Sequence, residues 1–209
     1  MKIQIFGTPR SGTTCLYEAL VNNINYTVGI YEPLNPAWTY KASSNNEITK
    51  HLNILNNCNI NIIEKNILES EYYVSSNLEG HKNISVTKIS KDLSFYKSYL
   101  KNFDKLIFLY RKNIDETAKS LAIALFTENF YYPYKNIDIN YEHLLPLVKT
   151  KNKMVEELAD YFKSPLIYYE DLYSNNIDFI NYFLKYFDIK VNNLDRFYFT
   201  LDTQHRLKK

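Results

Sequence analysis

The stretch Gly7–Thr14 narrows the possible folds of this chain more than any other. It reads Gly-Thr-Pro-Arg-Ser-Gly-Thr-Thr and lies between an apolar run, Lys2–Phe6, and an amphipathic stretch, Thr13–Asn22. Glycines let the backbone turn tightly, so that successive N–H groups point at one anion, and a helix N-terminus adds partial positive charge. The sequence therefore predicts a fold that begins with a strand, an anion-binding loop and a helix.

The rest of the chain alternates apolar runs typical of strands with spacings typical of helices. We expect strands at Lys2–Phe6, Tyr26–Tyr31, Ser85–Ile89, Lys105–Tyr110 and Pro165–Tyr169. We expect helices at Thr13–Asn22, 45–70, Asp115–Phe126, 141–162 and Ile177–Phe187. This alternation is typical of a parallel sheet covered on both faces. The predicted fold is a P-loop-like α/β fold of three layers, in which a parallel sheet lies between two layers of helices. Residues 1–209 are expected to form it as a single domain.

The predicted topology also indicates where a ligand binds. Right-handed crossovers bring the carboxyl ends of parallel strands to one edge of the sheet, and open α/β sheets bind ligands at that edge. The candidate site therefore lies in the loops that follow Phe6, Tyr31 and Tyr110.

Composition excludes several other classes of protein. Aromatic residues make up 16% of the 209 residues, too many for a disordered chain, and the net charge of +2 favours neither nucleic acid nor membrane as a partner. The two cysteines, Cys15 and Cys58, exclude a disulfide scaffold and a four-cysteine zinc site. No cluster has metal-ligand spacing, so we expect no metal. Without a signal peptide or a long apolar run, the protein is expected to be soluble and cytoplasmic.

One position in the loop bears on which anion it binds. Nucleotide hydrolases have the pattern G-x-x-x-x-G-K-[ST], in which the lysine reaches the β- and γ-phosphates. Gly7 and Gly12 have this spacing, but Thr13 replaces the lysine and the cation is Arg10, inside the loop. The sequence thus disfavours ATP or GTP phosphoryl transfer. A P-loop kinase or hydrolase with an unusual loop and a non-catalytic nucleotide-binding module both remain alternatives.

The loop resembles the 5′-phosphosulfate loop of sulfotransferases of the carbohydrate and small-molecule type. These enzymes move a sulfuryl group from 3′-phosphoadenosine 5′-phosphosulfate (PAPS) to a hydroxyl acceptor and release adenosine 3′,5′-bisphosphate. The resemblance implies that Arg10 contacts the phosphosulfate and stabilises the leaving group. It assigns the 5′ end of the donor to Pro9, Arg10, Ser11, Gly12, Thr13 and Thr14. The acceptor is expected to be a sugar or a small molecule, and the sequence does not indicate an oligomeric state.

A second family element holds the donor's 3′-phosphate with an arginine after a strand and a serine about eight residues later. Here the strand ends before Arg111 and the serine is Ser120, nine residues on. Lys112 stands at the spacing of eight, so the choice between Arg111 and Lys112 stays open. The forked guanidinium of arginine suits a phosphate.

Transfer to an alcohol needs a group that accepts the hydroxyl proton. Glu32 ends the second predicted strand, and carbohydrate sulfotransferases often use a glutamate base, so we expect Glu32 to be catalytic; alternatively it braces the following proline turn. We expect the histidines to be surface residues; they are His51, His81, His143 and His205. Lys88 either points into the cleft or extends to solvent from an edge. The basic tail Thr203–Lys209 is predicted to be solvated rather than closed over the donor.

Overall fold

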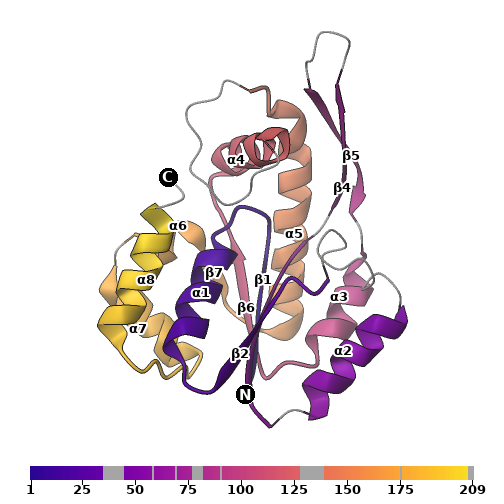
Figure 1. Cartoon of the computed structure of the whole chain (residues 1–209). Coiled ribbons are helices and arrows are strands. Elements are labelled where there is room, and N and C mark those ends of the chain that lie inside the picture. Colours follow the sequence, from indigo (N-terminus) through magenta and orange to yellow (C-terminus); the bar gives the residue numbers. More distant parts are fainter. Residues whose placement is uncertain are drawn as a thin grey trace.

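A sheet of five parallel strands lies at the centre of the computed structural model (Figure 1). The structure describes residues 1–34, 45–57, 59–68, 70–76, 82–89, 91–127, 139–174 and 176–206. In order across the sheet, the strands are β2 (Thr27–Tyr31), β3 (Asn61–Ile67), β1 (Lys2–Gly7), β6 (Lys105–Tyr110) and β7 (Leu166–Tyr168). All neighbouring strands in this sheet pair in parallel, and helices cover both faces. The expected three-layer α/β fold is confirmed.

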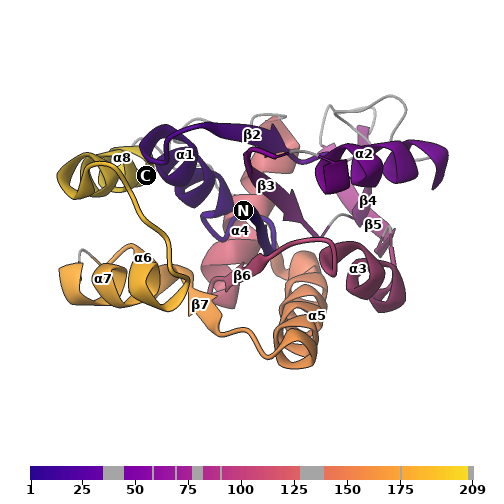
Figure 2. The same cartoon turned by 90° about the horizontal axis from the view of Figure 1, so that it is seen from below.

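The helices divide into two groups, one on each side of the sheet (Figure 2). One side carries α1 (Thr13–Asn23), α6 (Tyr169–Leu172), α7 (Ile177–Tyr186) and α8 (Leu194–Arg206). The other side carries α2 (Asn45–Asn57), α3 (Leu93–Leu100) and α5 (Leu145–Phe162). A 3₁₀ turn at Glu142–Leu144 precedes α5, and α4 (Ile114–Thr127) packs against α5 beyond the carboxyl ends of the strands (Figure 1).

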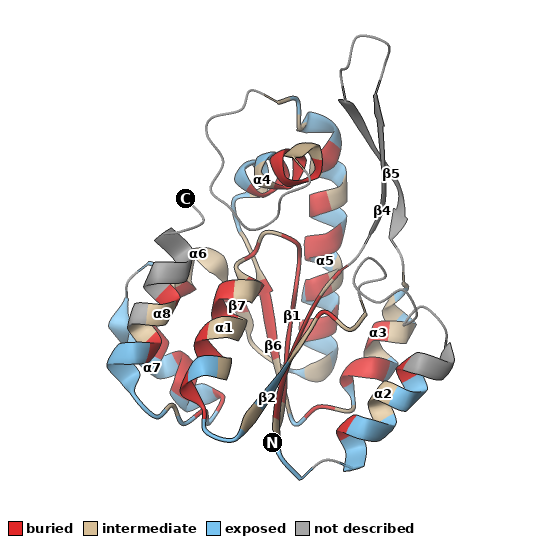
Figure 3. Ribbon diagram, viewed as in Figure 1, coloured by how far each residue is buried: buried red, intermediate tan, exposed pale blue. Residues whose placement is uncertain are grey.

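The central strand β1 separates two apolar cores because its side chains alternate between the faces. Ile3 and Ile5 pack among residues of α1, α7 and α8, whereas Phe6 packs against α3 and α5. All three residues are fully buried. Strand β1 is coloured largely as buried in Figure 3. The polar Gln4 between the two isoleucines is also fully buried, and its side-chain amide donates to the Ile5 carbonyl at 2.9 Å. The rigid central strand thus delivers the loop to a fixed place at the carboxyl edge of the sheet.

The prediction of a helix over 45–70 is wrong in its second half. Helix α2 ends at Asn57, and Asn61–Ile67 forms β3, which lies between β2 and β1. The run Glu64-Lys65-Asn66 conceals this strand in the sequence, since charged and amide side chains are unusual in a buried strand. In the fold each of the three has polar partners, as described below.

The predicted strand Ser85–Ile89 exists but belongs elsewhere. It is part of β5 (Lys82–Ile89), which pairs antiparallel with β4 (Ser70–Ser76) in a two-stranded sheet that extends away from the main one (Figure 1). The remaining predicted strands and helices are confirmed with ends shifted by a few residues at most. Helix α8 continues through Arg206, so the predicted tail begins as a helix. The side chains of Thr203–Arg206 and the whole of 207–209 lie outside the described residues, and the predicted solvation of the tail stays a prediction. Among the described helices, none has the length and apolar character needed to cross a membrane.

Candidate functional site

The glycine loop crosses the carboxyl edge of the sheet between β3 and β6. The Gly7 carbonyl accepts a hydrogen bond from Leu68 N at 2.9 Å, and Thr8 N donates to the Leu109 carbonyl at 3.2 Å. A Cβ on Gly7 would lie 2.2 Å from that same carbonyl oxygen, so only glycine allows this approach. Within the loop, Ser11 Oγ donates to the Thr8 carbonyl at 2.6 Å. The loop is therefore fixed to both neighbours of the central strand.

Gly12 ends the loop and begins α1. Its φ of +81° lies in the left-handed region, and a Cβ there would meet ring atoms of Tyr173 at 2.5 Å and Tyr169 at 2.8 Å. The Tyr173 hydroxyl donates to the Gly12 carbonyl at 2.7 Å. No side chain caps the start of α1, and its first turn has no acidic residue. The helix thus keeps a positive N-terminal end directed at the loop.

Two arginines from different strand ends meet near one tyrosine. Arg10 has a φ of +66°, and its Nε donates to Ser120 Oγ on α4 at 2.8 Å. The guanidinium carbon of Arg111 lies 4.7 Å from the centre of the Tyr169 ring. Burial raises the pKa of Tyr169, and the positive charges of Arg111 and Arg10 both oppose that rise. The candidate residues from the loop, from β6 and from α4 are therefore gathered in one place.

Arg111 has an unsatisfied donor, unlike the neighbouring Lys112. The Nε atom of Arg111 is buried and has no hydrogen-bond partner among the residues that the structure describes, and its Nη2 lies 3.5 Å from Glu116 Oε2. Lys112 is exposed; its Nζ lies 3.2 Å from Asp171 Oδ2 and 4.0 Å from the centre of the Tyr168 ring. A buried donor without an acceptor is costly and indicates that an acceptor group belongs there. Of the two cations, Arg111 is the better anion ligand.

Glu32 lies at the end of β2 and forms a buried ion pair. Its carboxylate contacts Lys65 Nζ of β3, and both side chains are almost fully buried. Lys65 Nζ also lies 4.1 Å from the centre of the Tyr31 ring, whose hydroxyl is 3.2 Å from Thr14 Oγ1. Because β3 separates β2 from β1, Glu32 does not neighbour the loop through strand pairing. The Tyr31–Thr14 contact connects the end of β2 to the start of α1.

Lys65 is the residue of this site that the sequence prediction missed. The signal was present, since a lysine stands near the end of a run whose apolar residues otherwise fit a buried strand. A buried ammonium requires a charged partner or several acceptors, and Glu32 provides the charge.

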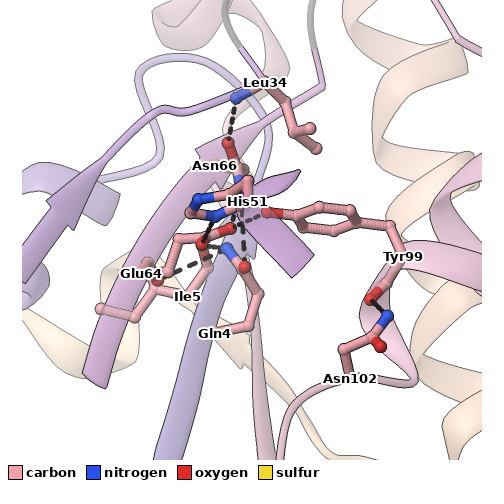
Figure 4. A network of polar contacts seen from close by, with 8 residues as sticks. All are labelled: Gln4, Ile5, Leu34, His51, Glu64, Asn66, Tyr99 and Asn102. Atoms are coloured by element: carbon pink, nitrogen blue, oxygen red, sulfur yellow. Dashed lines mark hydrogen bonds and ion pairs between the residues drawn. The ribbon is translucent and has the colours of Figure 1, made fainter. Parts of the chain in front are cut away.

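A second polar cluster occupies the opposite face of the sheet (Figure 4). The buried Glu64 carboxylate accepts hydrogen bonds from Tyr99 OH at 2.5 Å and Asn66 Nδ2 at 2.6 Å, and lies 2.7 Å from His51 Nε2. Burial and the negative charge of Glu64 raise the pKa of Tyr99 well above its usual range. The prediction that His51 lies on the surface is wrong, because its side chain is only 20% exposed and packs on Glu64.

The remaining cysteines, histidines and Lys88 are described only in part by the structure. Cys15 is buried, and His143 is exposed as expected. The side chains of Lys88 and His205 and the whole of Cys58 and His81 lie outside the described residues. Within the described ranges, no three or more His, Cys, Asp or Glu side chains gather as they would around a metal ion.

Comparison with known proteins identifies no relative. No sequence model of a protein family matches the chain, and no curated protein sequence matches it significantly.

Proposed function

We propose that this protein is a sulfotransferase that moves a sulfuryl group from PAPS to a hydroxyl of a sugar or small molecule. The proposal depends chiefly on one observation, the gathering of Arg10, Ser120 and Arg111 at the carboxyl edge of the sheet. Two guanidinium groups beside one loop suit a nucleotide that carries two separate anionic groups. PAPS is such a nucleotide, with a 5′-phosphosulfate and a 3′-phosphate.

The loop would hold the 5′ end of the donor. Backbone N–H groups of Ser11–Thr14 and the positive end of α1 favour a phosphate there. Arg10 supplies fixed positive charge where the leaving phosphate gains negative charge. It acts by charge alone because its guanidinium does not release a proton near neutral pH.

Arg111 would hold the 3′-phosphate. Its unsatisfied Nε supplies one donor, and a phosphate oxygen is a strong acceptor for it. The Tyr169 ring beneath the guanidinium restricts its motion, which lowers the entropy lost when a phosphate binds. Ser120, which the family resemblance pairs with Arg111, contacts Arg10.

The transfer step needs a group that accepts one proton, and Glu32 is our candidate. The acceptor oxygen forms a bond to sulfur as the bond between sulfur and the 5′-phosphate oxygen breaks. The electron pair of that broken bond leaves with adenosine 3′,5′-bisphosphate, and the hydroxyl proton moves to the Glu32 carboxylate. The ion pair with Lys65 fixes the position of the carboxylate. Because the pair is buried, its charges act through a medium of low dielectric constant.

Two observations disfavour the phosphoryl-transfer alternative. Thr13 stands where a phosphate-binding lysine would be, and β6 leads to Arg111 rather than to an acidic residue that could hold Mg²⁺.

Thermal unfolding with nucleotides tests the donor site first. Adenosine 3′,5′-bisphosphate should raise the melting temperature without Mg²⁺, and ATP with Mg²⁺ should raise it less. Stabilisation by ATP and Mg²⁺ alone would favour the kinase or hydrolase alternative.

Transfer is then measured with labelled PAPS and a panel of acceptors, namely a phenol, an aliphatic alcohol, a monosaccharide and an amino sugar. Arg10→Ala should abolish transfer, and Glu32→Gln should lower kcat by the roughly 10²–10⁴-fold that a general base contributes, which leaves a measurable residual rate. Bisphosphate binding without transfer to any acceptor would favour the non-catalytic module instead.

A further inference from the structure

Two adjacent residues of β3 hold the turn that carries Glu32, one from each face of the sheet. The Lys65 carbonyl accepts from Glu32 N at 2.7 Å, and on one face of the sheet the Lys65 ammonium pairs with the Glu32 carboxylate. On the other face, Asn66 Oδ1 accepts from Leu34 N at 3.1 Å (Figure 4). The turn is therefore attached to β3 immediately before and after Pro33.

The backbone of this turn requires such attachment. Glu32 has a φ of +46°, in the left-handed region that side chains other than glycine rarely adopt. A residue remains in that region only where the surrounding structure determines its conformation. The hydrogen bond between Leu34 N and Asn66 is one of the contacts that do so.

The cluster around Glu64 determines which way the Asn66 amide points. A carboxylate only accepts hydrogen bonds, so the NH₂ group of Asn66 faces Glu64 Oε1, 2.6 Å away. Its Oδ1 atom is then left to accept from Leu34 N. Tyr99 and His51 fix Glu64 in turn. The cluster thus turns a buried asparagine into a rigid acceptor for the turn.

We propose that Asn66 is a positioning residue for Glu32, which it orients through the Leu34 amide. This inference depends on the proposed function, since Glu32 needs fixed orientation only if it accepts a proton from the substrate. The Glu64 cluster then serves catalysis from the face of the sheet opposite Lys65, with no contact to donor or acceptor required.

Amide hydrogen exchange tests the structural half of the inference without any substrate. Asn66→Ala should raise the exchange rate of the Leu34 amide about tenfold or more, and leave the Thr8 amide, which bonds to Leu109, unchanged. Asn23→Ala is the matched control, because Asn23 is also buried but bonds to Ala19 at the far end of α1. That control should leave the Leu34 amide protected. Unchanged Leu34 exchange in folded Asn66→Ala protein would overturn the inference.

Kinetics test the catalytic half. Asn66→Ala should lower kcat about 100-fold, the scale of a small misplacement of a catalytic group, with unchanged affinity for adenosine 3′,5′-bisphosphate. In a Glu32→Gln background the same substitution should cause no further loss, because Asn66 acts through Glu32. Two results would overturn the positioning role while the sulfotransferase function stands. One is a double variant whose loss in kcat is the product of the two single losses, and the other is Asn66→Ala protein with the kcat of the wild type. A wild-type protein inactive toward PAPS would remove both proposals, whatever the Leu34 amide shows.

Discussion

Arg10 donates from Nε to the hydroxyl of Ser120 at 2.8 Å, although 110 positions separate the two residues. This bond connects the loop after β1 to α4, the helix that follows β6. Strands β1 and β6 are neighbours in the sheet, which brings the two segments that follow them close together. The family resemblance paired Ser120 with Arg111, so the contact with Arg10 gives Ser120 a second role, the orientation of Arg10.

The first prediction concerns this bond. Ser120→Ala should weaken the affinity for adenosine 3′,5′-bisphosphate about fivefold to tenfold, because Arg10 loses the acceptor that orients it. Lys119→Ala, on the exposed face of the same helix, is the control and should change the affinity little. Titration calorimetry measures both. Equal affinities for Ser120→Ala and wild-type protein would show that the bond has no part in binding.

The second prediction concerns the buried pair Lys65–Glu32. Lys65→Met should lower the free energy of unfolding by about 3–5 kcal/mol, because a buried carboxylate then lacks its cation. Adding Glu32→Gln to Lys65→Met should restore most of that loss. The exposed pair Lys153–Glu157 is the matched control, and Lys153→Met should cost at most about 0.5 kcal/mol. Urea unfolding measures each variant, and a loss below about 1 kcal/mol in Lys65→Met would contradict the burial of the pair.

The third prediction concerns Gly12. Gly12→Ala should destabilise the fold by about 2–4 kcal/mol, because it adds left-handed strain to an overlap with the rings of Tyr173 and Tyr169. Thermal and urea unfolding measure this change. If the variant unfolded at the same urea concentration as the wild type, the close packing of the Tyr169 and Tyr173 rings on Gly12 would be contradicted.

The fourth prediction concerns alkaline pH. The raised pKa of Tyr99 means that the folded protein holds this proton more tightly than the unfolded chain, whose tyrosines titrate near pH 10. The stability that Tyr99 contributes is therefore complete below pH 10 and is lost as the pH rises further. Tyr99→Phe should be less stable at pH 8 but should lose less stability between pH 9.5 and 11, by up to about 1.4 kcal/mol per pH unit. Identical pH slopes in urea unfolding would count against a buried Tyr99–Glu64 bond.

Much of the fold follows from short patterns in the sequence. The strand Lys2–Phe6, the loop from Gly7 and the helix from Thr13 were predictable, because backbone geometry at the two glycines and the buried apolar run point to the same structure. The very apolar strand before Arg111 was equally clear. For the same reason the loop and the Arg111 region were identified as candidate parts of one site.

The centre of the sheet was harder to predict. β3 was concealed because its polar residues Glu64 and Lys65 have partners that are distant in sequence, such as Tyr99 at 35 positions and Glu32 at 33. Sequence periodicity detects faces, not partners. The ion pair of Glu32 and the acceptor role of Asn66 therefore appear only once the strands are ordered.

The most direct measurement compares the binding of adenosine 3′,5′-bisphosphate with that of adenosine 5′-monophosphate by titration calorimetry. If the loop holds the 5′-phosphate and Arg111 the 3′-phosphate, wild-type protein should prefer the bisphosphate at least about tenfold. Arg111→Ala should abolish that preference, and Lys112→Ala, whose side chain pairs with Asp171, should keep it. Equal affinity of wild-type protein for the two nucleotides, or a preference that survives Arg111→Ala, would contradict a donor site anchored at two phosphates.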